Sequence, residues 1–216
     1  MSKLILQAPL AGWALPLDQV PDPVFAQRLA GDGVAIDPLN SVLHAPCDGE
    51  VVPMQKASHA VTLRTESGAE VLMHVGIDTV QLDGAGFEML VQPGQRVKAG
   101  DPLLSFDLDF VARRVPSMVT PVLLATEGKI VRRNEGQRVA VGDFLFEVEL
   151  AAQKSVASSG VALSRTFGVP FDHGLHARPA ALIVSALRPI GGDRAEVTIS
   201  ANLAGVPKAA TLTVRR

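Results

Sequence analysis

An internal repeat limits the folds open to this chain more than any other feature of its sequence. The octapeptide GQRVKAGD at residues 94–101 returns as GQRVAVGD at residues 136–143. Each copy precedes an apolar run, at 102–106 or 144–148. Glycine at both ends of the octapeptide suits backbone with positive φ, and aspartate suits the turn before a strand. The repeat therefore predicts two related β-motifs packed together, as in barrel-sandwich folds.

Short strands with turn residues between them are expected throughout residues 1–150. Apolar and β-branched runs alternate there with glycine-containing turns, as in all-β sandwiches and barrels. The clearest runs lie at 49–52, 60–65, 71–75 and 144–148. Helical turns are expected only near 23–29 and 108–114. We therefore predict a mainly β fold for this part, an antiparallel barrel-sandwich of the duplicated hybrid motif type.

The pattern of the sequence changes after residue 150. Residues 151–160 are small and polar, which is typical of a linker. Within 161–216, the sequence predicts a strand at 161–167, a helix at 180–187 and a strand at 195–200. The order of these elements indicates a second, smaller α+β module.

Composition excludes several classes of protein. Aromatic residues make up 4% of the 216 residues and tyrosine is absent, which argues against stacking platforms for nucleic acid. The one cysteine, Cys47, excludes an internal disulfide and a thiolate metal cluster. The sequence shows neither a signal peptide nor an apolar run long enough to span a membrane, so we expect a cytoplasmic protein.

Charge divides the chain into two parts of opposite sign. Residues 1–160 carry 13 basic and 19 acidic side chains, a net charge of −6, whereas residues 161–216 carry 7 and 3, a net charge of +4. Opposite charges of this kind can steer the docking of modules or partners.

Two histidines are expected to meet on one β-hairpin. A two-residue loop at Ser67 and Gly68 would place His74 opposite Val61, with His59 diagonal to it on the same face. A loop centred one residue earlier would place the two histidines directly opposite. In either register their Cβ atoms would lie about 5 to 8 Å apart.

Such a pair is compatible with three interpretations: a zinc site, a base and nucleophile for covalent transfer, or simple packing. A zinc hydrolase needs at least a third protein ligand, and neither His-x-His nor His-Glu-x-x-His is present. A nucleophilic imidazole needs less, because its neutral form has a lone pair at pH 7. A lipoyl or biotinyl carrier domain is a further alternative, but Lys56, the nearest candidate for the modified lysine, has the wrong spacing.

The residues around His74 form a long motif. Residues 71–87 read VLMHVGIDTVQLDGAGF, and this segment closely resembles the active site of the glucose-type enzyme IIA of the bacterial phosphoenolpyruvate-dependent sugar phosphotransferase system. The likeness extends over nearly all of 7–149. Its other motifs are APL at 8–10, VPDPVFA at 20–26, GDGVAI at 31–36, APCDG at 45–49, SHA at 58–60 and GQRV at 94–97.

The resemblance implies a role for each residue of the motif. His74 would accept a phosphoryl group, and His59 would assist its transfer. Gly76 would orient the His74 ring through its carbonyl oxygen, and Asp78 belongs to the same motif. Ala57 stands where the family often has a threonine. No cofactor is implied, although zinc bridging the two histidines and a partner's carboxylate would be compatible with phosphoryl transfer.

A second motif, GLHARPA at 174–180, lies at the entrance of the predicted helix. It resembles the phosphorylation site of HPr, the histidine-containing phosphocarrier of the same system. The N-terminus of a helix favours an anion, and Pro179 suits the first turn. The resemblance implies that His176 is a nucleophile and that Arg178 donates hydrogen bonds to phosphoryl oxygens. It covers 161–216 without the last helix, strand and helix of the family, so we predict a truncated HPr-like module.

These resemblances imply a phosphotransferase that works through phosphohistidine, the front part of an enzyme IIA–HPr–enzyme I fusion. The phosphoryl group would pass from enzyme I to His176 or to a separate HPr, and then to His74. From there it would reach the IIB domain of a glucose or N-acetylglucosamine permease. Enzyme I, HPr and IIB are the expected partners, with no nucleic acid, and with the membrane reached only through the permease. Cys47 is not expected to be a IIB-type nucleophile.

Overall fold

The computed structural model describes residues 2–53, 58–150, 167–168, 194–203 and 206–215. The chain divides into two compact units, Met1–Gln153 and Lys154–Arg216. No helix among the described residues has the length and apolar character needed to cross a membrane.

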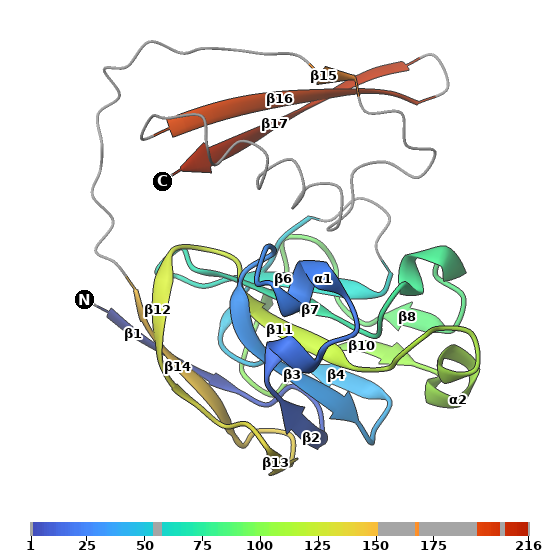
Figure 1. Ribbon diagram of the computed structural model, residues 1–216, viewed down its shortest axis with the longest axis vertical. Helices are drawn as coiled ribbons and strands as arrows, with labels where there is room; N and C mark the ends of the chain where they lie inside the picture. The colour runs from blue at the N-terminus through green and yellow to red at the C-terminus, as the bar shows by residue number, and fades with distance from the viewer. Residues whose placement is uncertain (1, 54–57, 151–166, 169–193, 204–205, 216) are drawn as a thin grey trace. The chain divides into compact units, whose positions relative to one another are not determined.

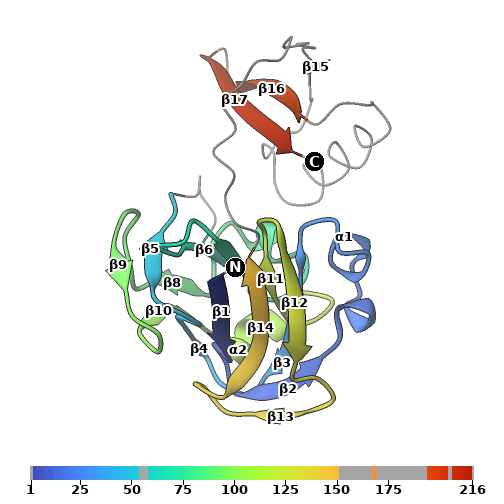
Figure 2. The same ribbon diagram turned by 90° about the vertical axis from the view of Figure 1, so that its left-hand side faces the viewer.

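Antiparallel strands build the first unit (Figure 1). Its largest sheet has eight strands, in the spatial order β13 (Gln137–Val139), β2 (Gly12–Leu15), β3 (Asp32–Pro38), β11 (Thr120–Leu124), β7 (Glu70–His74), β6 (Ala60–Arg64), β5 (Gly49–Val51) and β9 (Arg96–Val97). Two three-stranded sheets accompany it. The first, in front in Figure 2, consists of β1 (Ser2–Gln7), β14 (Phe144–Leu150) and β12 (Gly128–Arg133), and the second of β4 (Val42–His44), β10 (Pro102–Phe106) and β8 (Phe87–Met89).

Helices in this unit are short. They are η1 (Leu17–Gln19), α1 (Pro23–Ala26), η2 (Thr79–Leu82) and α2 (Leu108–Ala112). The carboxylate of Asp22 accepts a hydrogen bond from the Val24 N–H at 2.7 Å, and Pro23 occupies the first turn, so the start of α1 is well defined. Both α-helices lie where the sequence predicted helical turns.

The predicted duplication is present in the hydrogen bonds as well as in the sequence. Ala8 exchanges backbone hydrogen bonds with Asp143 and Gly142 of one octapeptide, and Ala45 exchanges the same bonds with Asp101 and Gly100 of the other. We call the strands β4–β10 the inner motif. The strands β1–β3 and β11–β14, which precede and follow it, form the outer motif. The two motifs join where β7 pairs with β11.

One core serves the whole of the first unit. Alternate residues of β6 and β7, such as Leu63 and Met73, point into it, while their neighbours stay partly open to solvent. Leu104 from β10 and Phe146 from β14 pack into the same core from the two smaller sheets. The sequence is therefore correctly read as mainly antiparallel β in this part.

In the second unit, β16 (Arg194–Leu203) and β17 (Val206–Arg215) form an antiparallel hairpin, and β15 (Phe167–Gly168) pairs with β16 in parallel. The predicted strand at 195–200 lies within β16. The predicted linker at 151–160 and the predicted helix at 180–187 lie outside the described residues.

Candidate functional site

The two hairpin histidines meet where β6 begins and β7 ends, inside the eight-stranded sheet. Their ring centroids lie 4.8 Å apart and their planes are inclined at 67°. His74 is the last residue of β7 and is partly exposed, whereas His59 directly precedes β6 and is 7% exposed. The predicted meeting of the imidazoles is confirmed.

The predicted hairpin register is wrong. Thr65 pairs with Ala69, so the loop has three residues, and Ala60 instead of Val61 lies opposite His74. The Thr65 hydroxyl closes the loop, because it accepts a hydrogen bond from the Ala69 N–H at 3.1 Å. His59 reaches His74 because it lies just before β6, where the alternation of a regular strand no longer fixes the direction of a side chain.

One hydrogen bond determines which nitrogen of His74 can react. His74 Nδ1 lies 2.9 Å from the carbonyl oxygen of Gly76. A carbonyl oxygen only accepts hydrogen bonds, so Nδ1 carries the proton and, in the neutral ring, Nε2 has the lone pair. Burial lowers the pKa of His74, although the Gly76 hydrogen bond and the Asp22 carboxylate oppose the shift. The imidazole is thus neutral and nucleophilic at pH 7.

The end of the β7–β11 ladder makes room for this loop. β7 pairs with β11 as far as Met73 and Val122. The next residue of β11 is Pro121, which has no N–H to give to a ladder. Beyond it, Gly76 adopts φ +70°, and Asp78 adopts φ +59° immediately before η2.

Three further side chains act on the pair, and the sequence did not predict that they would. The Phe25 ring lies 5.4 Å from the His74 ring, and the Phe87 ring 6.3 Å from the His59 ring. Asp22, which is 5% exposed, acts electrostatically on His74. The Asp-Pro-Val-Phe sequence predicts the start of a helix but not the face of the sheet on which that helix packs.

Several residues singled out from the sequence lie outside the described part. These are His176, Arg178, Lys56 and Ala57. Among the described residues, no group of three His, Cys, Asp or Glu side chains is placed to hold a metal ion. His59 and His74 could supply two nitrogen ligands at most.

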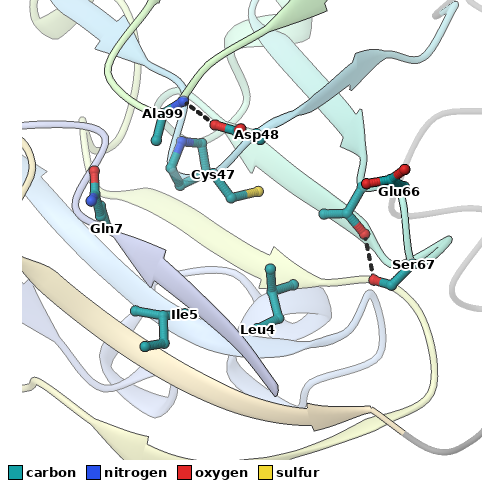
Figure 3. A pocket seen from close by; sticks show the side chains of 10 residues that line it. Leu4, Ile5, Gln7, Cys47, Asp48, Glu66, Ser67 and Ala99 are labelled. Carbon is teal, nitrogen blue, oxygen red and sulfur yellow. Dashed lines mark hydrogen bonds between the residues drawn. The ribbon is translucent and has the colours of Figure 1, made fainter. Parts of the chain in front are cut away.

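Cys47 lies in a different place, beside a hollow of about 450 Å³ at the loop end of the β6–β7 hairpin (Figure 3). The side chain of Leu4 points toward Cys47, and Ser67 lies across the hollow from it. Burial, with a smaller contribution from Asp48, raises the pKa of the Cys47 thiol to about 12. The thiol therefore stays protonated, which makes it a poor nucleophile.

Comparison with known proteins identifies the family. The family model for the phosphoenolpyruvate-dependent sugar phosphotransferase system, EIIA 1, matches residues 4–130. The chain is 48% identical over 117 residues to the glucose-specific EIIA component of Bacillus cereus, which covers 54% of this chain and 71% of the relative. It is also 49% identical over 122 residues to the mannose-specific EIIBCA component of Corynebacterium glutamicum, which covers 56% of this chain.

The fold gives the same result. The glucose permease IIA from Mycoplasma capricolum superposes with a TM-score of 0.65 at 40% identity, covering 68% of this chain and 96% of that structure. The chain spans only 18% of the length of the Corynebacterium relative. The fold and the family match define the class of the protein, an EIIA component of a sugar phosphotransferase system. The chain belongs to the EIIA 1 family of the phosphoenolpyruvate-dependent sugar phosphotransferase system.

Proposed function

We propose that His74 accepts a phosphoryl group on Nε2 from phospho-HPr and donates it to the IIB domain of a sugar permease. The hydrogen bond from His74 Nδ1 to the Gly76 carbonyl, at 2.9 Å, is the observation that carries this proposal. This hydrogen bond leaves the lone pair on Nε2, the ring nitrogen that the Gly76 loop does not hold. The partly exposed ring can then meet a donor or an acceptor at the surface of the protein.

Each transfer is an in-line displacement at phosphorus. The Nε2 lone pair of His74 forms the new N–P bond while the bond to the donor imidazole breaks, and its electron pair stays on the donor nitrogen. In the next step a thiolate of the IIB domain forms the S–P bond, and the His74 N–P electron pair returns to Nε2. No redox partner is needed, and catalysis consists mainly of positioning and electrostatics.

His59 is the residue that we assign to assistance in this transfer. Its ring lies 4.8 Å from the His74 ring, close enough to donate a hydrogen bond to a phosphoryl oxygen carried on His74. Gly76 orients the acceptor ring. The carboxylates of Asp22 and Asp78 favour the cationic imidazolium, which makes the phosphorylated ring a better leaving group.

We further propose the division 1–150 for enzyme IIA, 151–160 for a linker and 161–216 for a partial HPr-like module. In that module His176 would take the phosphoryl group from enzyme I, and Arg178 would stabilise it. The GLHARPA motif and the net charge of +4 support this proposal. We propose that the two modules belong to an enzyme IIA–HPr–enzyme I fusion.

Glucose or N-acetylglucosamine is the sugar that we propose, in a protein that works at the cytoplasmic face of the permease. The names of the relatives support a hexose, since they specify glucose for Bacillus cereus and mannose for Corynebacterium glutamicum. No cofactor is required for the reaction. A zinc ion bound by His59 and His74 would need a further ligand from a partner, so it would belong to an interface and not to the transfer step.

A reconstituted transfer assay tests the proposal. Membranes that contain a glucose permease with IIB but no IIA are given phosphoenolpyruvate, enzyme I, HPr and the protein. Phosphorylation of glucose should depend on the protein and should fail with His74→Gln. Omitting HPr tests whether His176 replaces it. Sugar phosphorylation by His74→Gln at the normal rate would overturn the proposal.

A further inference from the structure

The glycine that holds the His74 ring is itself held from two other places in the fold. The carbonyl oxygen of Val75 accepts a hydrogen bond from Thr79 Oγ1 at 2.9 Å. The N–H of Gly76, at the other end of the same peptide bond, donates to Thr120 Oγ1 at 3.4 Å. Both threonines are 0% exposed. Two buried hydroxyls thus fix the two ends of the Val75–Gly76 peptide bond.

The following peptide bond completes the link to the histidine. The Ile77 N–H donates to the carbonyl oxygen of Ser117 at 2.8 Å, and the Gly76 carbonyl accepts from His74 Nδ1. Because amide groups in series polarise one another, the bond at Ile77 strengthens the Gly76 carbonyl as an acceptor. Both peptide bonds of Gly76 are therefore oriented by groups outside the histidine hairpin.

Gly76 needs this support because of its own conformation. Its φ of +70° is open to glycine, which has no strong preference among backbone conformations. The direction of its carbonyl is consequently set by the surrounding hydrogen bonds. A side chain at this position would meet the Thr79 methyl group at 2.8 Å from its Cβ, so Thr79 also restricts the space beside the loop.

We infer that Thr79 and Thr120 are positioning residues for His74. Their hydroxyls fix the Val75–Gly76 peptide bond, and this anchor, together with the bond from Ile77 to Ser117, sets the direction of the Gly76 carbonyl and so keeps the His74 proton on Nδ1. The inference deepens the proposed function. Its consequence, that Nε2 stays available to attack phosphorus, rests on the proposed function. The geometric part does not depend on phosphoryl transfer.

The test removes each hydroxyl and measures the tautomer directly. Thr79→Val and Thr120→Val keep the shape of the side chain, whereas Thr79→Ser and Thr120→Ser keep the hydroxyl. In protein with 15N-labelled histidine, at a pH where the ring is neutral, NMR gives the ratio of the Nδ1–H to the Nε2–H tautomer of His74. The loss of one hydrogen bond should lower that ratio by about 2- to 12-fold, and the serine variants should restore it.

Thr126 supplies a matched control. Its hydroxyl accepts a hydrogen bond from the Glu70 N–H at 3.3 Å, at the other end of β7. Thr126→Val should therefore lose some stability and leave the His74 tautomer ratio unchanged. Phosphoryl acceptance from phospho-HPr should slow in the Thr79 and Thr120 valine variants in proportion to the measured loss of the Nδ1–H fraction, and should stay unchanged in Thr126→Val.

Folded valine variants at 79 and 120 with the wild-type tautomer ratio would overturn the inference, and so would an equal shift in Thr126→Val. If one valine variant does not fold, the other decides the outcome together with its serine counterpart. Failure of wild-type His74 to take up phosphate would instead overturn the proposed function, because the tautomer ratio is measured without any phosphoryl donor.

Discussion

The inner and outer motifs share one framework, yet only the inner motif carries the histidine pair. In the strand register of the inner motif, Glu50 lies opposite Arg96 on one side and Arg64 on the other. In the outer motif, Trp13 lies in the same way opposite Arg138 and Asp37. In each motif one strand lies between two others, β10 between β4 and β8, and β14 between β1 and β12.

The registers show which residues replace the histidines in the outer motif. His74 pairs with Ala60, and the equivalent pair is Leu123 and Gly33, so Leu123 occupies the position of His74. By the same register, Asp32 occupies the position of His59, and it forms ion pairs with Arg28 and Arg133.

The connections also differ between the motifs. Residues 75–86 link β7 to β8 and include the Gly76 loop, whereas residues 125–127 alone link β11 to β12. The duplication supplies a stable frame, and the proposed chemistry needs two changed positions and one longer loop. A functional site can thus arise on one copy while the other copy keeps the core intact.

The largest expected effect is a difference between His74 and Leu123, which occupy equivalent positions in the two motifs. His74→Gln should abolish phosphoryl acceptance, because the amide nitrogen of glutamine is not nucleophilic, and should change stability little. Leu123→Ala removes a fully buried side chain and should cost about 2 to 5 kcal/mol in the free energy of unfolding. Labelling from phospho-HPr measures phosphoryl acceptance by both variants, and urea unfolding measures their stability. Loss of acceptance in folded Leu123→Ala would show that the two positions are not functionally distinct.

His59 and Asp32 form the second matched pair. His59→Gln should still accept phosphate on His74 but donate it to IIB more slowly by roughly 10²- to 10⁴-fold, the range for loss of a general acid–base partner. Asp32→Asn should leave both rates unchanged and cost about 1 kcal/mol, since its ion pairs are partly exposed. Rapid-quench measurement of acceptance and donation tests this, and normal donation by His59→Gln would show that His59 takes no part.

His74 in the inner motif and Asp32 in the outer motif should contribute differently to the pH dependence of stability. Burial lowers the pKa of His74 from its ordinary value of 6.5, so the unfolded chain binds a proton more readily and stability should fall as pH falls below about 6.5. Partial burial would raise the pKa of Asp32, but hydrogen bonds from Arg133 and Arg28 outweigh it and lower that pKa from 3.8. Its contribution should be lost only below about pH 4.

Urea titrations from pH 8 to pH 3 measure both transitions. His74→Gln should remove the pH dependence that begins near 6.5, and Asp32→Asn should remove part of the dependence at lower pH. Phosphoryl acceptance by the wild type should persist below pH 6.5, because the His74 ring remains neutral there. A wild-type acceptance rate that halves at or above pH 6.5 would contradict this assignment.

The smallest effects should be the same in both motifs. Asp101 Oδ2 accepts a hydrogen bond from the Lys98 N–H at 2.8 Å, and Asp143 Oδ2 accepts one from the Ala140 N–H at 2.7 Å. Asp101→Ala and Asp143→Ala should each cost about 0.5 to 1.5 kcal/mol, and the two losses should add in the double variant. Thermal unfolding of the three variants tests the equivalence, which a cost confined to one motif would refute.

The sequence predicts the frame of this protein better than the details of its site. The octapeptide repeat and the apolar runs identify the strands, because turn residues and alternation act locally. The hairpin register could not be predicted, since the Thr65 side chain decides the length of the loop. Phe25 reaches His74 from α1, and Thr120 reaches Gly76 from β11, so only the folded chain shows that they belong to the site.

The position of the phosphoryl group tests the central claim most directly. The protein is incubated with phosphoenolpyruvate, enzyme I and intact HPr, and the phosphohistidine is mapped by mass spectrometry and assigned to a ring nitrogen by 31P and 15N NMR. The geometry requires phosphate on His74 Nε2, with Nδ1 still hydrogen-bonded to Gly76. Within residues 1–150, phosphate on His59, or on Nδ1 of His74, would contradict the account.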